Sequence, residues 1–217
     1  MDYIAVMDYE HLDNGMFLTA FAQALASQKL SRGVIIHGDS AYTERLMQTG
    51  MLREDAVVRS VKDLNHRLIA LLADHGIAAI GLNGYQRSLI RQSGSEVHID
   101  TGQLNRLPSS PHLLISNLVD SASENRPRPL ELPLYAAALC SALDISELLV
   151  FSLDDTEEII RRKRPDTLYK NQLDAEFLNS RIPEEFRDIS MPFRITTAGS
   201  FADYPSKKGT TLILPDT

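Results

Sequence analysis

The stretch Gly33-Val34-Ile35-Ile36-His37-Gly38-Asp39-Ser40 decides the fold class. Its three β-branched residues form a short buried strand, and the glycine that follows allows a tight turn directly after it. Similar runs at Tyr3–Met7 and Ile77–Leu82 are separated from this strand by helical patterns. Strands that alternate with helices in this way predict an α/β fold with a mostly parallel central sheet.

Three helices are expected between these strands. The first has Phe17, Phe21 and Leu25 on one face and a cap at Asp13 or Asn14. A short helix covers residues 42–48, and a longer one carries apolar positions from Val57 to Leu72 and ends near Gly76.

The rest of the chain continues the pattern after a polar segment at residues 121–128, which we interpret as a linker. A helix is expected to begin at Pro133, because proline is favoured in the first helical turn. Further strands are expected at Glu96–Ile99, Leu113–Leu118 and Leu148–Ser152, partial helix at Thr156–Asn179, and two edge strands at Phe193–Thr196 and Thr211–Leu214.

The composition is that of an ordinary globular protein. The 217 residues suit one large α/β domain or two joined lobes, and the net charge of −7 predicts no general affinity for nucleic acid or for an acidic membrane. No apolar run approaches a membrane span, and the N-terminus lacks the pattern of a secretion signal. The single cysteine, Cys140, suits a reducing cytoplasm and is expected to be a buried core thiol. The basic run Arg161–Arg164 is interpreted as a solvated loop or helix end.

Two glycine turns follow strands that should point the same way. His37-Gly38-Asp39-Ser40 follows one strand and Gly81-Leu82-Asn83-Gly84 follows another. Because ligands bind at the carboxyl ends of parallel strands, we expect the two turns to lie side by side and to form a cleft. Its exposed amides favour a small anion or carboxylate, although Asp39 argues against a densely charged one. Taken alone, either turn is more simply interpreted as structural, and the presence of two such turns is what favours a binding cleft.

One polar cluster near the N-terminus needs separate comment. His11 lies close in sequence to Asp8, Glu10 and Asp13. No known ligand spacing is present, so we interpret these residues as surface polarity ahead of a helix cap and predict no metal site.

The glycine turns also carry a resemblance to a known family. Val34 to Ser40 resembles the strand and His-Gly-Gly-Gly loop of acetylglutamate kinases, and Ala79 to Gly84 resembles their Gly-Leu-Ser-Gly turn. The similarity continues at matching distances through Asn65–Leu72, Gly94–Ile99, Leu113–Val119, Ala136–Leu139 and Leu149–Asp154. Near the C-terminus, Met191–Ile195 and Lys208–Ile213 resemble aspartokinases of the same amino-acid kinase superfamily.

This resemblance implies a three-layer α/β/α sandwich, with a substrate-binding and dimerisation lobe at residues 1–120 and a reduced nucleotide-binding lobe at 121–217. It implies a homodimer and a ligand site formed by His37, Gly38, Asp39, Ser40, Gly81, Asn83 and Gly84. Arg53 and Arg59 are alternatives for the arginine that pairs with a carboxylate, and a solvated helix arginine is the third reading of either. Ser152 and Asp154 correspond to a remnant of the nucleotide site.

The residues that transfer phosphate in the family have no counterpart here. Met7-Asp8-Tyr9-Glu10 stands where the family has Lys-x-Gly-Gly, and acidic residues there would repel a triphosphate. Pro133 replaces the aspartate that organises the catalytic lysines, and no Gly-Met-x-x-Lys occurs between Thr156 and Ser190.

The sequence therefore predicts an acetylglutamate kinase-like protein without catalytic residues that acts as a ligand-binding or regulatory subunit. Its candidate partner is an active relative. The alternative is an active kinase of a small carboxylate in which Lys163, Lys170 or Lys207 replaces the missing lysines. ATP and magnesium are cofactors only under that alternative.

Overall fold

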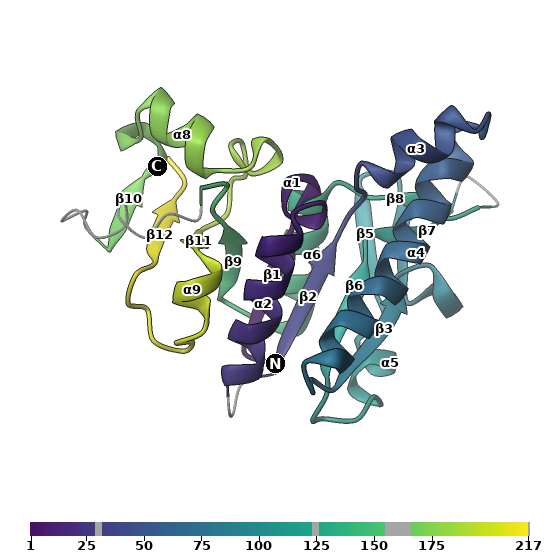
Figure 1. Ribbon diagram of the computed structural model, residues 1–217, viewed down its shortest axis with the longest axis horizontal. Helices are drawn as coiled ribbons and strands as arrows, with labels where there is room; N and C mark the ends of the chain where they lie inside the picture. Colours follow the sequence, from purple (N-terminus) through teal and green to yellow (C-terminus); the bar gives the residue numbers. More distant parts are fainter. Residues whose placement is uncertain (29–31, 123–125, 155–165, 217) are drawn as a thin grey trace.

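The structure, a computed structural model, describes residues 1–28, 32–122, 126–154 and 166–216. Its centre is an eight-stranded sheet with the strand order β10-β12-β11-β9-β1-β2-β6-β3 (Figure 1). All neighbouring strands are parallel except β11 and β12. The strands are β1 (Tyr3–Met7), β2 (Gly33–His37), β3 (Ala79–Asn83), β6 (His112–Ser116), β9 (Leu148–Phe151), β10 (Thr167–Tyr169), β11 (Phe193–Thr196) and β12 (Thr211–Leu214).

Helices α2 (Gly15–Ser27), α4 (Arg53–Asp74) and α9 (Ala198–Phe201) cover one face of this sheet. Side chains alternate along each strand, so Tyr3, Ala5 and Met7 of β1 face these helices. Aromatic rings fill much of this layer, with Phe151 of β9 edge-on to Phe21 at 5.5 Å between ring centroids.

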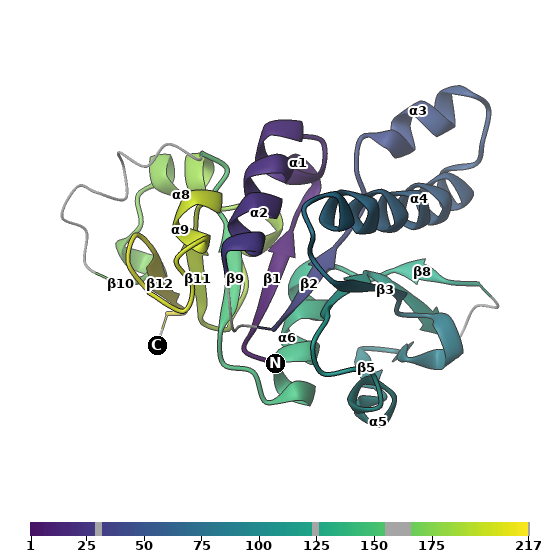
Figure 2. The ribbon, with the colours of Figure 1, turned by 60° about the horizontal axis from the view of Figure 1, so that its bottom comes forward.

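The opposite face is covered mainly by α6 (Leu132–Leu143), with α5 (Thr101–Asn105) toward the β3 end (Figure 2). Phe177 of α8 (Ala175–Arg181) joins the core on this side of the sheet. Ile4 and Val6 of β1 point to this side and share a core with Tyr135 and Leu139 of α6. The chain is thus a three-layer α/β/α sandwich with a mostly parallel central sheet, which confirms the predicted fold class.

A second, four-stranded sheet has the order β5-β4-β7-β8. It is built from β4 (Ile90–Ser93), β5 (Glu96–Ile99), β7 (Leu118–Ser121) and β8 (Arg128–Pro129). Two short helices, α1 (Tyr9–Leu12) and α3 (Tyr42–Gln48), follow β1 and β2. No helix in the described part of the chain combines the length and the apolarity needed to cross a membrane.

Most predicted elements are present with nearly the predicted bounds. Asn14 caps α2 by accepting hydrogen bonds from the amides of Met16 and Phe17, and Gly76 ends α4 with a φ of 73°. Cys140 is buried, and burial raises the pKa of its thiol to about 11.

The prediction of two edge strands near the C-terminus was wrong for both. β11 lies between β9 and β12, and β12 is covered by β10, a strand that the sequence did not indicate. The connection between β11 and β12 contains the short helix α9. Most of the charged run that includes Arg161–Arg164 lies outside the described residues, and α8 is the helix observed in the later part of Thr156–Asn179. The division into lobes at residue 120 stays a prediction.

Gly81 has a packing role. A Cβ at this position would lie 2.6 Å from Oδ1 of Asn65 and 2.9 Å from Cγ1 of Ile69, both on α4. Contacts this short require a shift of the helix, so the missing side chain is what lets α4 lie close against β3.

We therefore expect Gly81→Ala to lower the free energy of unfolding by about 1–3 kcal/mol, as overpacking does in other cores. Gly15→Ala is the matched control, because a Cβ there meets nothing within 4 Å and alanine favours a helix. Urea unfolding of both variants measures the difference. Equal stability of the two variants would contradict the packing role of Gly81.

Candidate functional site

A cleft opens where β1, β2 and β6 end, beside the N-terminus of α6. Its volume is about 680 Å³, which is in the range of small-molecule sites. We call it the carboxyl-edge cleft. Its lining residues are Tyr9, Gly38, Asp39, Arg53, Val57, Asn117, Pro129, Leu130, Glu131, Leu132, Pro133, Glu184, Glu185 and Asp188.

The two glycine turns are not neighbours, so the prediction that they lie side by side was wrong. β6 runs between β2 and β3, and its Ser116 pairs with His37 on one side and with Asn83 on the other. Sequence spacing could not reveal this, because β6 comes later in the chain than both turns. Of the predicted ligand-binding residues, Gly38, Asp39 and Arg53 line the cleft.

His37 is fully buried and serves the sheet. Its Nδ1 lies 3.0 Å from the carbonyl oxygen of Gly38, and its Nε2 lies 3.0 Å from Nδ2 of Asn65. The carbonyl can only accept and the amide NH₂ can only donate, so the ring carries its proton on Nδ1 and is neutral. Burial lowers the pKa of His37 to about 4, which agrees with this assignment.

The remaining predicted residues of the two turns also make internal contacts. Ser40 is buried, and its Oγ accepts a hydrogen bond of 3.3 Å from the amide of Tyr42. The amide of Asn83 donates to Oε1 of Gln86 at 3.1 Å, and its Oδ1 accepts from Oγ of Ser116 at 2.8 Å. Gly84 is closely packed, since a Cβ there would lie 2.8 Å from the carbonyl oxygen of Leu118. Neither Asn83 nor Gly84 lines the cleft.

The end of β1 holds a buried carboxylate and histidine, which corrects the interpretation of this cluster as surface polarity. Asp8 and His11 are each 4% exposed, and Oδ1 of Asp8 lies 2.5 Å from Nδ1 of His11. Nε2 of His11 lies 3.0 Å from the carbonyl oxygen of Ser152 after β9. Both ring nitrogens face acceptors, so a protonated imidazole paired with the Asp8 carboxylate satisfies both contacts.

This arrangement only superficially resembles a catalytic triad. His11 contacts the backbone carbonyl of Ser152, whereas the Ser152 hydroxyl donates to the carbonyl oxygen of Asp154 at 2.9 Å. A histidine that does not reach the hydroxyl cannot accept its proton. The contact therefore ties β1 to β9 and gives no nucleophile.

The end of β9 is occupied by Arg181 from α8. Its guanidinium is 2% exposed, its NH2 lies 3.0 Å from Oδ2 of Asp154, and its NH1 donates to the carbonyl oxygen of Asp154. NH1 is also 3.4 Å from the Ser152 hydroxyl. The two residues predicted as a nucleotide-site remnant thus both contact this arginine.

The carboxyl-edge cleft is strongly acidic. Asp39, Glu131, Glu184, Glu185 and Asp188 line it, with Arg53 as its one basic lining residue among those described. Glu184 and Glu185 belong to the short 3₁₀ turn Glu184–Phe186. Burial raises the pKa of Glu185 above its usual value, and the charges of Asp8 and Glu131 raise it further. A hydrogen bond from the amide of Leu132 lowers this pKa, but by less than these effects raise it.

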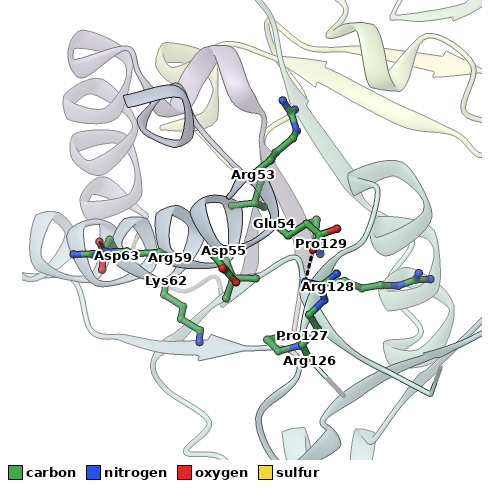
Figure 3. Close-up of a pocket in the computed structure, with 12 residues that line it drawn as sticks. Arg53, Glu54, Asp55, Arg59, Lys62, Asp63, Arg126, Pro127, Arg128 and Pro129 are labelled. Carbon is green, nitrogen blue, oxygen red and sulfur yellow. Dashed lines mark ion pairs between the residues drawn. The ribbon is translucent and has the colours of Figure 1, made fainter. Parts of the chain in front are cut away.

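A groove of about 690 Å³ continues from the cleft between α4 and β8 and shares Arg53, Val57 and Pro129 with it. In Figure 3 the side chains of Arg53 and Lys62 extend in opposite directions from α4. Both arginines proposed for carboxylate binding lie on this helix. Arg53 is 3.8 Å from Glu44 and borders the cleft, whereas Arg59 is 3.8 Å from Asp63 and lines only the groove.

Comparison with solved structures identifies the architecture. N-acetylglutamate synthase from Neisseria gonorrhoeae, solved with coenzyme A and N-acetyl-glutamate, matches all of this chain with a TM-score of 0.65 and 18% identity. Aspartate kinase from Synechocystis matches all of it with a TM-score of 0.68 and 12% identity. Isopentenyl phosphate kinase from T. acidophilum matches 98% of it with a TM-score of 0.63 and 11% identity.

The chain has the amino-acid kinase fold. It spans 60% of the synthase and 40% of the aspartate kinase, but the full length of the isopentenyl phosphate kinase. No protein-family model matches the sequence, and no curated protein is significantly similar to it. At these identities the likeness establishes the fold alone.

The buried histidine gives a pH test of the structure. The pKa of His37 is about 4 in the folded protein and about 6.5 when unfolded, so the unfolded chain takes up its proton first. Its contribution to stability is therefore present above pH 6.5 and is lost as the pH falls toward 4. We expect wild type to lose roughly 3 kcal/mol more than His37→Gln over this range. Urea unfolding at pH 7 and pH 4 measures the difference, and parallel losses would show that His37 is not buried and neutral.

Proposed function

We propose that this chain is a non-catalytic member of its fold, an acetylglutamate kinase-like protein that binds a small ligand in the carboxyl-edge cleft and acts as a binding or regulatory subunit. The observation that carries the proposal is the buried contact between Asp8 and His11 at the end of β1. The family resemblance puts a lysine and two glycines at this position. Asp8 and His11 satisfy each other there, so this position offers no free cation to neutralise a phosphate.

The end of β9 supports the same proposal. Arg181 contacts both Ser152 and Asp154, so a nucleotide that used these residues would have to displace a buried guanidinium. Displacement leaves charged groups without their partners, which costs several kcal/mol. One structural neighbour is named a synthase and not a kinase, so the fold does not dictate phosphotransfer.

The alternative is an active kinase of a small carboxylate, and the fold alone is compatible with it, since an isopentenyl phosphate kinase shares the fold over its full length. Two of the lysines suggested for that role are engaged elsewhere and do not line the cleft, although Lys170 lies near its residue Asp188. Nζ of Lys207 is 2.8 Å from Glu147, which precedes β9, and Nζ of Lys170 donates to the carbonyl oxygen of Ile189. The third, Lys163, lies outside the described residues.

We expect magnesium ATP to bind weakly or not at all, because the acidic cleft repels a triphosphate and no described lysine lines the cleft to offset its carboxylates. Isothermal calorimetry at neutral pH measures this. A dissociation constant in the low micromolar range, about −8 kcal/mol, would contradict the loss of kinase function. Phosphorylation of any small carboxylate would do so more directly.

A homodimer also belongs to this proposal, as does association with an active relative. β3 forms one edge of the eight-stranded sheet, and Ile69 and Leu71 of α4 are partly exposed beside it. An exposed strand edge with apolar neighbours favours pairing with a second chain. Light scattering at tens of micromolar should give twice the mass of 24.2 kDa. A monomeric mass would count against the dimer.

A further inference from the structure

We propose that the carboxyl-edge cleft binds a small organic cation, a compound with an ammonium or guanidinium group, held by Glu131, Asn117 and the ring of Tyr9. The inference rests on the proposed function, because it names the ligand class of the same cleft. It reverses the sign of the ligand that the glycine turns predict.

The first argument is charge. Five carboxylates and one guanidinium line the cleft, and the Arg53 side chain is 69% exposed beside Glu44. Among the described residues, no lysine or arginine lies within ion-pair distance of Glu131, Glu184, Glu185 or Asp188. Lys170 interacts electrostatically with Asp188 from beyond ion-pair distance, so the carboxylates still outnumber the cations beside them, and such an excess attracts a further cation.

The amide oxygen of Asn117 is an acceptor that no described residue uses. Asn117 lines the cleft and is 6% exposed. Its Nδ2 donates to the carbonyl oxygen of Leu130 at 2.8 Å, which fixes the orientation of the amide, since the oxygen in that place would face another oxygen. Oδ1 is then turned away from Leu130 and accepts no hydrogen bond from any described residue. Oδ1 is covered by its neighbours, and a buried acceptor without a donor is costly, so a ligand N–H that reaches this oxygen on binding would be stabilised by it.

The third argument is the aromatic ring of Tyr9, which is 41% exposed in the cleft. A cation over such a ring is stabilised by its quadrupole. The pKa of Tyr9 is raised by partial burial and then by nearby carboxylates that include Asp13 and Asp39. These carboxylates create a negative potential at the ring, and a cation placed there would be stabilised by it.

The cleft suits an organic cation better than a metal ion. In the described part of the chain, no three His, Cys, Asp or Glu side chains are arranged to hold a metal. The space of about 680 Å³ is far larger than one ion needs, and Leu130, Leu132 and Pro133 give it apolar walls. These walls suit the carbon chain of an amine or guanidinium compound.

Two probes of the same shape isolate the charge. n-Butylguanidinium is a cation, whereas n-butylurea is its neutral counterpart. In an NMR titration of the ¹⁵N-labelled full chain, we expect a dissociation constant of about 1 mM for n-butylguanidinium and one at least tenfold higher for n-butylurea. Shifted amide signals should include those of Tyr9, Asn117 and Glu131.

Matched variants locate the site. Tyr9→Leu should weaken n-butylguanidinium about fivefold, whereas Tyr9→Phe keeps the ring and should bind like wild type. Glu131→Gln should weaken binding of n-butylguanidinium about tenfold, because a carboxylate is lost. Glu131 is the N-cap of α6, but its side chain makes no hydrogen bond to the helix, so the substitution should leave α6 intact. Glu96→Gln, at an exposed position of β5 that does not line the cleft, should bind like wild type and controls for the overall charge.

Failure of this inference is distinguishable from failure of the proposed function. Equal binding of n-butylguanidinium and n-butylurea, or no binding at about 20 mM, overturns the cation site. N-acetyl-L-glutamate that binds in the same cleft while the cation does not would overturn the cation site but keep a small-ligand protein. Tight binding of magnesium ATP would overturn the loss of kinase function whatever the cation does.

Discussion

The buried contact between Asp8 and His11 is the interaction on which the carboxyl edge of the sheet depends. It joins the end of β1 to the end of β9, because His11 bridges Asp8 and the carbonyl oxygen of Ser152. The ring of His11 also packs on Phe17 of α2, with centroids 4.2 Å apart. Removing either partner would leave a polar group buried without compensation, which usually costs several kcal/mol. The resembled family has a glycine loop and a lysine at this position, and the proposed function rests on this contact standing in their place.

The other strand ends follow the same principle. His37 is held by Asn65, Asn83 by Ser116, and Asp154 by Arg181. Polar groups that satisfy one another are not available to a ligand, so most of the carboxyl edge is closed. The exception is the side next to α6, where Glu131, Glu184, Glu185 and Asp188 form no ion pair with a described residue and Oδ1 of Asn117 accepts no hydrogen bond from one. The candidate site therefore lies near the start of α6 and not between the glycine turns, where the sequence predicted it.

The sequence predicted the fold well because the fold depends on local patterns. The β-branched strands, the asparagine cap at Asn14 and the glycine at Gly76 each act within a few residues, and they appear where expected. The site was harder to predict because it depends on contacts between distant segments. Nothing in the sequence places Arg181 against Asp154, or Glu185 against Leu132. The insertion of β6 between β2 and β3 likewise depends on the topology of the whole sheet. A signal did exist at His11, whose i, i+3 spacing from Asp8 suits a first helical turn capped by a carboxylate.

The central claim is that the carboxyl edge binds a cation near α6 and no nucleotide. A crystal structure of the full chain, grown with both n-butylguanidinium and a non-hydrolysable magnesium ATP analogue, tests this claim most directly. The account predicts the cation beside Glu131 and Asn117, with Asp8 still paired to His11, Arg181 still on Asp154, and no nucleotide. A nucleotide bound at the ends of β1 and β9, with Arg181 displaced and the Asp8 contact broken, would contradict it.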